Sequence, residues 1–227
     1  FEVEREDRMP LIVNPITQLF RESARIEIET FGMWPEREFG FIGNGCFNSF
    51  TGWWRKPVEG DIAPWFVFVD TVLVDIPGAP EFLHDWVASI VQAPWNKHHT
   101  FITLAGKVQG TGKSLLGKTI AEMLGTTDTD RTDRRPPPAY LASGDGFLGH
   151  FNKQLEGKVF MLVDELGSDK GKHVDAMKNL VTSTKFELTA KYRDTVTQDN
   201  YCNFIITTNH GTALLVDETS RRDVIFN

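Results

Sequence analysis

A short glycine-rich stretch at residues 106–114 constrains the fold more than any other part of the sequence. It lies between an apolar run at residues 101–105, which is typical of a buried strand, and a helical pattern that ends at Gly125. A strand, a glycine loop and a helix in this order turn backbone N–H groups and the positive end of the helix dipole toward a bound phosphate. The residues that we expect to bind a nucleotide are Gly110, Thr111, Gly112, Lys113 and Ser114.

Lys113 and Ser114 have separate expected roles in this loop. We expect the ammonium group of Lys113 to reach the β- and γ-phosphates of ATP and to act in catalysis, and the hydroxyl group of Ser114 to bind Mg²⁺. The usual spacing of a phosphate-binding loop would place its first glycine at Lys107, whereas this sequence has Gly106 one residue earlier. We therefore expect the turn to differ slightly from the common form.

Adjacent carboxylates follow a second apolar run, at residues 159–163. We expect Asp164 to hold Mg²⁺, directly or through water, and Glu165 to orient and deprotonate the water that attacks the γ-phosphate. Two carboxylates with these two roles favour an ATP hydrolase of the AAA+ or RecA type over a nucleoside kinase, whose acceptor is a hydroxyl group. A third apolar run, at residues 203–208, ends in Asn209, although an asparagine after a strand is often only a turn residue.

The alternation of apolar runs with helical stretches predicts an α/β fold with a central, mostly parallel sheet. Before this part, all six tryptophans lie within residues 34–95, and glycines alternate with aromatic residues at positions 40–54. We expect a small, turn-rich accessory subdomain here, with its aromatic rings packed inward and a helix that begins at Pro80. The predicted division is therefore residues 1–95 for the accessory subdomain and residues 96–227 for an ATPase core that is incomplete at its C-terminus.

The charge is unevenly distributed along the chain. Lys and Arg total 24 against 31 Asp and Glu, a net charge of −7, which excludes a protein that binds polyanions over its whole surface. Residues 1–130 hold 11 basic and 18 acidic side chains, whereas residues 131–227 hold 13 of each. The second half is therefore the expected place for a polyanion to bind.

Cys46 and Cys202 stand apart from any CxxC or Cys/His cluster, so neither a disulfide framework nor a zinc site is predicted. No apolar run approaches the ~20 residues needed to cross a bilayer, and the first residues lack the pattern of a signal peptide. We expect a soluble cytoplasmic protein without a membrane partner. Because the sequence begins with Phe1 and stops within an apolar run, we expect a fragment of a longer chain.

The glycine loop, the acidic pair and the strand ending in Asn209 resemble the A, B and C motifs of the superfamily three helicases, the AAA+-related motors of viruses, phages and plasmids. The nearest resemblance is to the helicase domain of phage and plasmid primase-helicases of the primase-polymerase-linked group. Further segments that carry it are 47–52, 109–114, 149–152 and 155–156. The resemblance implies an AAA+-like P-loop core, hydrolysis of ATP with Mg²⁺, a hexameric ring and a central channel for single-stranded DNA. It also implies that Asn209 contacts the γ-phosphate or the attacking water.

A hairpin pattern supplies the expected contact with DNA. Residues 186–190 and 195–198 alternate on either side of a short polar tip, which predicts a β-hairpin after a helix at residues 173–181. The resemblance implies that this hairpin projects into the channel and grips the DNA backbone. The residues that we expect to contact DNA are Lys191, Tyr192 and Arg193.

Arg221 and Arg222 precede a last apolar run at residues 224–226. The resemblance implies that one of them is an arginine finger inserted into the ATP site of the neighbouring subunit, and we favour Arg222 as this catalytic residue. An arginine placed against the transferring phosphate can be worth ~10³–10⁵ in rate. Ring assembly and hydrolysis would then be coupled.

These expectations combine into an ATP-dependent DNA helicase motor, a hexamer that moves along single-stranded DNA during replication of a phage, plasmid or other mobile element. Two alternatives stay open: an ATP-driven loader or remodeller of a protein partner, and a ring-forming nucleotide-binding module without turnover. Glu165 argues against the second, because a pure binder needs no base. A primase or polymerase domain, if the full chain has one, would lie upstream, since residues 1–95 contain no paired-carboxylate motif that would supply such a site.

Overall fold

The computed structural model describes residues 2–5, 8–12, 28–55, 57–106, 110–126, 137–143, 146–149, 152–164, 170–189, 191, 195–209 and 223–226. The α-helices in these ranges are α2 (Ala63–Val72), α3 (Ala79–Gln92), α4 (Lys113–Leu124) and α5 (Lys170–Thr182). Short 3-10 helices are η1 (Gly146–Leu148) and η2 (Lys153–Leu155). The strands outside the central sheet are β1 (Glu2–Arg5), β2 (Arg8–Ile12), β3 (Thr30–Gly32), β4 (Gly40–Gly43), β5 (Cys46–Asn48), β9 (Lys185–Leu188) and β10 (Val196–Asp199).

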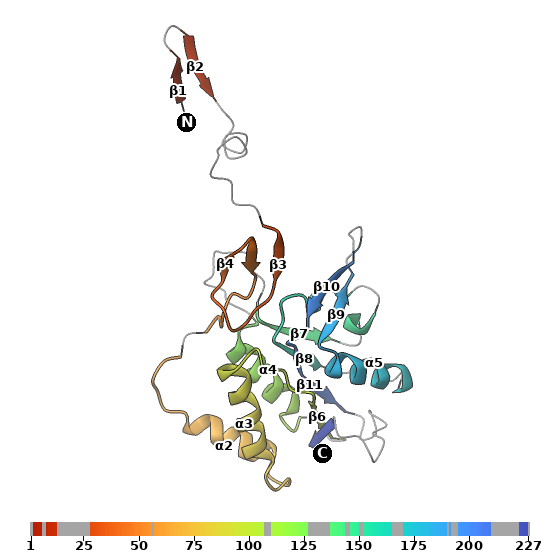
Figure 1. Ribbon diagram of the computed structural model, residues 1–227. Helices are drawn as coiled ribbons and strands as arrows, with labels where there is room; N and C mark the ends of the chain where they lie inside the picture. Colours follow the sequence, from red (N-terminus) through yellow and green to blue (C-terminus); the bar gives the residue numbers. More distant parts are fainter. Residues whose placement is uncertain are drawn as a thin grey trace.

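The central sheet has five parallel strands in the order β12-β6-β11-β8-β7 (Figure 1). They are β6 (Phe101–Ala105), β7 (Ala139–Ser143), β8 (Phe160–Asp164), β11 (Asn203–Thr208) and β12 (Asp223–Phe226). The α/β class and the mostly parallel sheet are thus confirmed. Because β11 lies between β6 and β8 and is buried along its whole length, three strands far apart in sequence end side by side at one edge.

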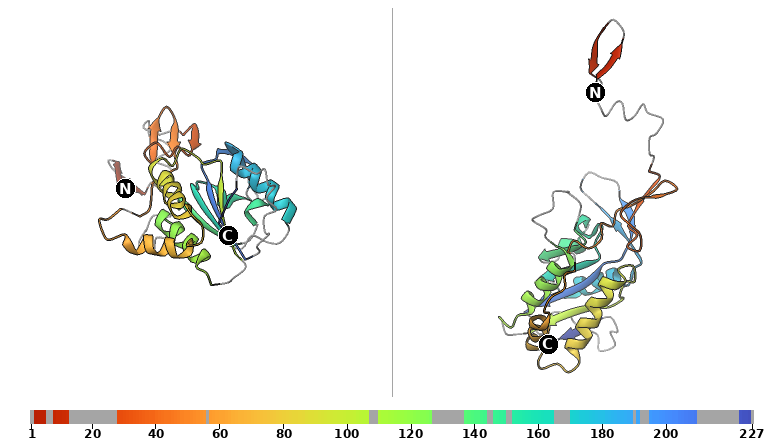
Figure 2. Two further views of the ribbon diagram at one scale, coloured as in Figure 1. Left: turned by 90° about the horizontal axis from the view of Figure 1, so that it is seen from below. Right: turned by 90° about the vertical axis from the view of Figure 1, so that its left-hand side faces the viewer.

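Each face of the sheet carries its own hydrophobic core. Side chains alternate between faces along a strand, so Ile102, Leu162 and Ile205 pack on one side while Met161 and Phe204 pack on the other. The first core includes α3 and α4, and the second includes α5. Figure 2 shows these helices on opposite faces of the sheet.

Helix α4 lies unusually close to β8. A Cβ atom added at Gly117 would come within 2.6 Å of Leu162 Cδ1, so a larger residue would push the helix away from the strand. Helix α3 confirms the expectation of a helix starting near Pro80, and it buries an apolar stripe that includes Leu83, Trp86 and Ile90. These contacts hold both helices on the face that carries the first core.

The aromatic-rich part contains a three-stranded sheet in the order β3-β5-β4. The buried Asn48 side chain holds it together, since its Oδ1 atom accepts from Trp34 N at 2.8 Å and its Nδ2 atom donates to Trp34 O at 2.9 Å. Phe50 is buried in the first core, as predicted, but Trp95 is 48% exposed, so the inward packing of rings is only partial. Because this core also includes residues of the central sheet, the two predicted parts share apolar packing.

Strands β9 and β10 form the predicted antiparallel hairpin, with Leu188 opposite Val196. Asn152 fixes the outer side of β9, because its Nδ2 atom donates to Glu187 O at 2.8 Å and its Oδ1 atom accepts from Thr189 N at 2.9 Å. The segment around η2 therefore supports the hairpin close to its tip. Strands β1 and β2 form a separate antiparallel hairpin.

Lys97 lies four residues before β6 and contacts the end of α5. Its ammonium group donates to Leu180 O at 2.9 Å and to Ser183 O at 3.1 Å. The side-chain amide of Asn200 donates to the same two carbonyl oxygens, at 2.7 and 3.0 Å. Carbonyl groups at the end of a helix otherwise lack partners, so these donors stabilise the end of α5.

Within the described ranges, none of the helices combines the length and the apolar content that a membrane span requires.

Candidate functional site

The glycine loop connects β6 to α4 at the carboxyl edge of the central sheet. Gly110 and Gly112 have φ angles of +80° and +90°, in the left-handed region that favours glycine. Leu116 N donates to Gly112 O at 2.8 Å, so the loop continues directly into the first helical turn. The loop therefore ends at the positive end of a helix 12 residues long, where backbone N–H groups attract anions.

The side chain of Lys113 folds back over the loop. Its ammonium group donates a hydrogen bond to Thr111 Oγ1 at 2.6 Å. It also lies against Gly106, where an added Cβ atom would come within 2.9 Å of Lys113 Nζ. The glycine that stands one residue earlier than usual therefore leaves room for this ammonium group. Residues 107–109, where the predicted difference in the turn also falls, lie outside the described residues.

Asp164, at the end of β8, is the centre of a polar cluster. Its Oδ1 atom accepts from Ser114 Oγ at 2.9 Å and from Thr207 Oγ1 at 2.6 Å. Its Oδ2 atom lies 2.9 Å from the ammonium group of Lys118. The cluster brings Ser114, in the first turn of α4, together with the ends of β8 and β11.

The hydrogen bonds in this cluster stabilise the ionised form of Asp164. Burial alone would raise the pKa of this carboxyl group, but hydrogen bonds from Thr207, Lys118 and Ser114, together with the charge of Lys118, lower it below its usual value. Asp164 is therefore a carboxylate at neutral pH, the form that can bind a metal cation.

Asn209 follows β11 directly and is half-buried. The register pairs Thr207 with Asp164 and Thr208 with Ala105, so β6, β8 and β11 end at the same level. Asn209 therefore lies at the edge of the sheet that carries Asp164 and the glycine loop. This is the position in an open parallel sheet where ligands bind, beyond the carboxyl ends of the strands.

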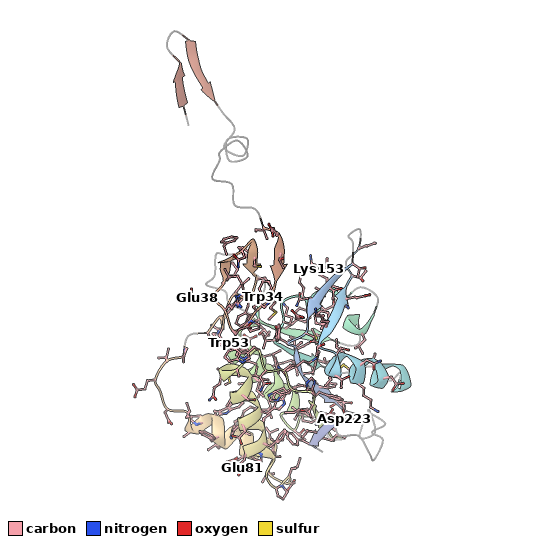
Figure 3. The ribbon with its side chains drawn as sticks, viewed as in Figure 1. Trp34, Glu38, Trp53, Glu81, Lys153 and Asp223 are labelled. Carbon is pink, nitrogen blue, oxygen red and sulfur yellow. The ribbon has the colours of Figure 1, made fainter. Side chains whose placement is uncertain are left out.

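Several predicted site residues lie outside the described residues: Glu165, Tyr192, Arg193 and Arg222. Lys191 is described, and it is exposed at the tip of the β9–β10 hairpin. Figures 1 and 2 place this hairpin at the other end of the core from α2 and β12. Lys153, next to Asn152, lies on the hairpin side in Figure 3, whereas Asp223 of β12 lies toward the other end.

A cleft of about 460 Å³ opens beside the glycine loop. One wall comes from the end of α2 and the turn after it, and the other from the end of β6, the loop and β12. The residues that line it are Val72, Leu73, Asp75, Ile76, Leu104, Ala105, Gly106, Thr111, Lys113 and Phe226. The cleft thus has both apolar and polar lining, with the ammonium group of Lys113 among the polar groups, a combination suited to a ligand with an apolar part and an anionic group.

Lys118 and Thr207 were missed by the sequence reasoning although both contact Asp164. Lys118 stands four residues after Ser114, a spacing that puts both side chains on one face of a helix and could have indicated it. Thr207 lies inside an apolar run, and only the register of β11 against β8 places its hydroxyl group beside the carboxylate.

The fold and the site define an α/β protein with a five-stranded parallel sheet and a glycine loop that opens a helix beside a half-buried carboxylate. The chain belongs to the family described as "Family of unknown function (DUF5906)", whose profile matches residues 104–222. This range covers the glycine loop, Asp164, the hairpin and Asn209. Among curated proteins, none matches the chain.

Solved structures of the C-terminal region of NrS-1 share this fold. The A form apo structure of residues 305–718 has a TM-score of 0.67 and 20% sequence identity, covering 86% of this chain and 45% of that one. A second A form apo structure and another apo structure of residues 305–718 each have a TM-score of 0.68 and 21% identity, covering 86% of this chain and 46% of theirs. The chain therefore spans less than half the length of the structures it matches, and the likeness at this identity concerns the fold.

Proposed function

We propose that the chain is the ATP-hydrolysing motor of a DNA helicase. The observation that carries this proposal is the contact between Ser114, in the first turn after the glycine loop, and Asp164, at the end of the neighbouring buried strand. A hydroxyl group and a carboxylate placed together behind a phosphate-binding loop are the parts that ATP and GTP hydrolases use to hold Mg²⁺. The motifs quoted above support the helicase assignment over other ATPases, and the fold shared with the NrS-1 C-terminal region is compatible with it.

In this proposal the phosphates of ATP lie against the loop and the nucleoside lies in the adjacent cleft. Backbone N–H groups near Gly110 and Gly112 and the ammonium group of Lys113 would bind the phosphate oxygens. Apolar residues of the cleft, such as Ile76 and Phe226, would contact the base. Part of the nucleotide site then comes from α2, outside the predicted ATPase core.

The donor set of the cluster fits Mg²⁺. Ser114 Oγ and Asp164 Oδ1 are hard oxygen ligands 2.9 Å apart, and adjacent ligands of an octahedral Mg²⁺ stand about 2.9 Å from each other. The described residues contain no group of three or more His, Cys, Asp or Glu side chains, so the remaining ligands would be phosphate oxygens and water. Bound there, Mg²⁺ would neutralise charge on the β- and γ-phosphates.

Hydrolysis needs further groups, and the sequence supplies candidates. Glu165 is the next residue after Asp164, and we assign it the role of orienting and deprotonating the attacking water. Asn209 would hydrogen-bond the γ-phosphate or this water. Arg222, or its neighbour Arg221, would reach the ATP site of an adjacent subunit in a hexameric ring.

The β9–β10 hairpin is the proposed contact with single-stranded DNA, through Lys191, Tyr192 and Arg193. Its place at the other end of the core from the cleft separates the DNA contact from the nucleotide. Copies of the tip gathered around a ring would concentrate positive charge that a chain of net charge −7 otherwise lacks. Such a motor would serve the replication of a phage, plasmid or other mobile element, with a primase or polymerase domain possible upstream.

The test combines nucleotide binding with turnover. Lys113→Ala should abolish ATP binding, measured by calorimetry, whereas Glu165→Gln should bind ATP and fail to hydrolyse it. Single-stranded DNA should stimulate hydrolysis by the unchanged chain at concentrations where rings assemble. ATP hydrolysis that is insensitive to DNA at every concentration would favour a remodeller of protein partners instead.

A further inference from the structure

The two oxygen atoms of the Asp164 carboxylate have different partners. Oδ1 accepts from the hydroxyl groups of Ser114 and Thr207, whereas Oδ2 is paired with the ammonium group of Lys118 at 2.9 Å. The expected metal ligands, Ser114 Oγ and Asp164 Oδ1, therefore meet on one side of the carboxylate. The ammonium group of Lys118 occupies the other side.

Helix α4 places Lys118 beside Asp164 Oδ2. Ser114 and Lys118 are four residues apart on α4, so their side chains share the face that is turned toward β8. The close approach of the helix at Gly117, where an added Cβ atom would clash with Leu162, keeps this face within reach of Asp164. The ion pair is partly shielded, with the Asp164 side chain 21% exposed and the Lys118 side chain 45% exposed.

We propose that Lys118 sets the magnesium dependence of nucleotide binding by neutralising Asp164 when no metal is bound. This inference rests on the proposed function, since it concerns the same ATP site. A triphosphate that approaches the glycine loop without Mg²⁺ would meet the negative charge of Asp164, and Lys118 cancels much of that repulsion. The same ammonium group competes with Mg²⁺ for the carboxylate, so the chain binds metal-free ATP better and gains less from the metal than it would without Lys118.

Lys118→Met tests this directly, because methionine keeps much of the side-chain length and removes the charge. The quantity to measure is the ratio of the Kd for ATP in excess EDTA to the Kd in millimolar Mg²⁺, by calorimetry on the 227-residue chain. Charges a few ångströms apart in a partly shielded site interact strongly enough that we expect this ratio to rise about tenfold in Lys118→Met, mainly through weaker binding in EDTA. Lys118→Arg, which keeps the charge, should stay within about twofold of the unchanged chain.

Lys153→Met is the matched control for loss of a positive charge elsewhere. Lys153 pairs with Glu156 near the hairpin, and its removal should leave the ratio unchanged. An equal rise in Lys153→Met, or no rise in Lys118→Met while its thermal unfolding without nucleotide stays normal, would overturn the proposal. If Lys118→Met shows no rise but the unchanged chain binds ATP in Mg²⁺, the proposed function still stands. If the unchanged chain binds ATP neither in Mg²⁺ nor in EDTA, the proposed function and this inference are both refuted.

Discussion

Val72 of α2 fills the space that a side chain at Gly112 would need. Its Cγ2 atom lies 2.9 Å from the position of a Cβ atom built on Gly112, so the end of α2 packs directly on the glycine loop. Gly112 also has a φ angle of +90°, which residues other than glycine rarely adopt. The conformation of the loop therefore depends on a helix about 40 residues earlier in the sequence.

Gly112→Ala should weaken both the fold and nucleotide binding. The left-handed backbone alone costs about 1–2 kcal/mol for a residue with a Cβ atom, and the contact with Val72 adds to this. We expect the free energy of unfolding, measured in urea, to fall by at least this amount and ATP affinity to fall with it. The double variant Gly112→Ala, Val72→Ala removes the contact and should recover part of the affinity relative to Gly112→Ala. If the second substitution gave no recovery, packing of α2 on the loop would not matter for binding.

Asn152→Ala should loosen the hairpin without affecting the ATP site. The substitution removes the hydrogen bonds to Glu187 O and from Thr189 N, a loss of about 2 kcal/mol at about 1 kcal/mol each. Amide hydrogen exchange in β9 should become faster and affinity for single-stranded DNA should fall, while ATP affinity stays the same. Lys191→Ala is the comparison, since it should lower DNA affinity and its dependence on salt but leave exchange in β9 unchanged. Normal exchange in Asn152→Ala would contradict the supporting role of this residue.

Lys97 and Lys158 should make the fold more stable as the pH rises above neutrality. Burial lowers the pKa of each from 10.5 to about 8. Between these values the unfolded chain binds protons that the folded chain does not, so the free energy of unfolding increases with pH. From pH 7 to pH 9 we expect about 1.4 kcal/mol for each lysine, because the folded group loses its proton near pH 8 and one pH unit of proton difference corresponds to about 1.4 kcal/mol. Cys202, whose pKa burial raises from 9.0 to about 12, opposes this trend mainly above pH 9.

Urea unfolding at pH 7, 8 and 9 measures this effect. Lys97→Met and Lys158→Met should each lose about half of the increase, because each removes one of the two titrating groups. Lys153→Met, at a side chain that is 52% exposed, should keep the whole increase. An undiminished increase in both buried variants would assign the pH dependence to other groups.

Arg222→Ala should bind ATP nearly normally but hydrolyse it slowly if the residue serves a neighbouring subunit. Mixing it with Lys113→Ala should then restore some hydrolysis, because an intact ATP site of one chain meets an intact arginine of the other. The measurement is ATP turnover across mixing ratios, with mixed assemblies verified independently. Lack of any rescue in verified mixed assemblies would place Arg222 outside the neighbour's site.

The sequence was sufficient for the parts whose signal is local. The strands β6, β8 and β11 are continuous apolar runs, as expected for strands buried on both faces, and α4 begins and ends at glycines. Helix α2 (Ala63–Val72) was not predicted because its first seven residues are all apolar and show no helical period. Strand β7 was missed because it directly follows a run of prolines, which is typical of a loop.

The residues of the candidate site likewise fall into those with a local sequence signal and those whose contacts depend on the fold. Lys113, Ser114 and Asp164 are found by spacing within single segments, whereas the contacts of Thr207 and Lys118 with Asp164 depend on the register of two strands and on how closely a helix packs. Gly117 illustrates the second dependence, since nothing in its sequence context shows that Leu162 lies against it. The roles of Glu165 and Arg222 stay predictions.

The hydrogen bonds of Lys97 connect the start of β6 with the segment that leads into the β9–β10 hairpin. Lys97 stands four residues before β6, the strand that leads into the glycine loop. Its ammonium group donates hydrogen bonds to Leu180 O and Ser183 O, which lie just before the base of the hairpin. Asn200, which follows β10, donates to the same two carbonyl groups, so the approaches to β6 and β11 are both fixed to the end of α5. A change in the position of the hairpin base would therefore be passed to the strand that leads into the glycine loop.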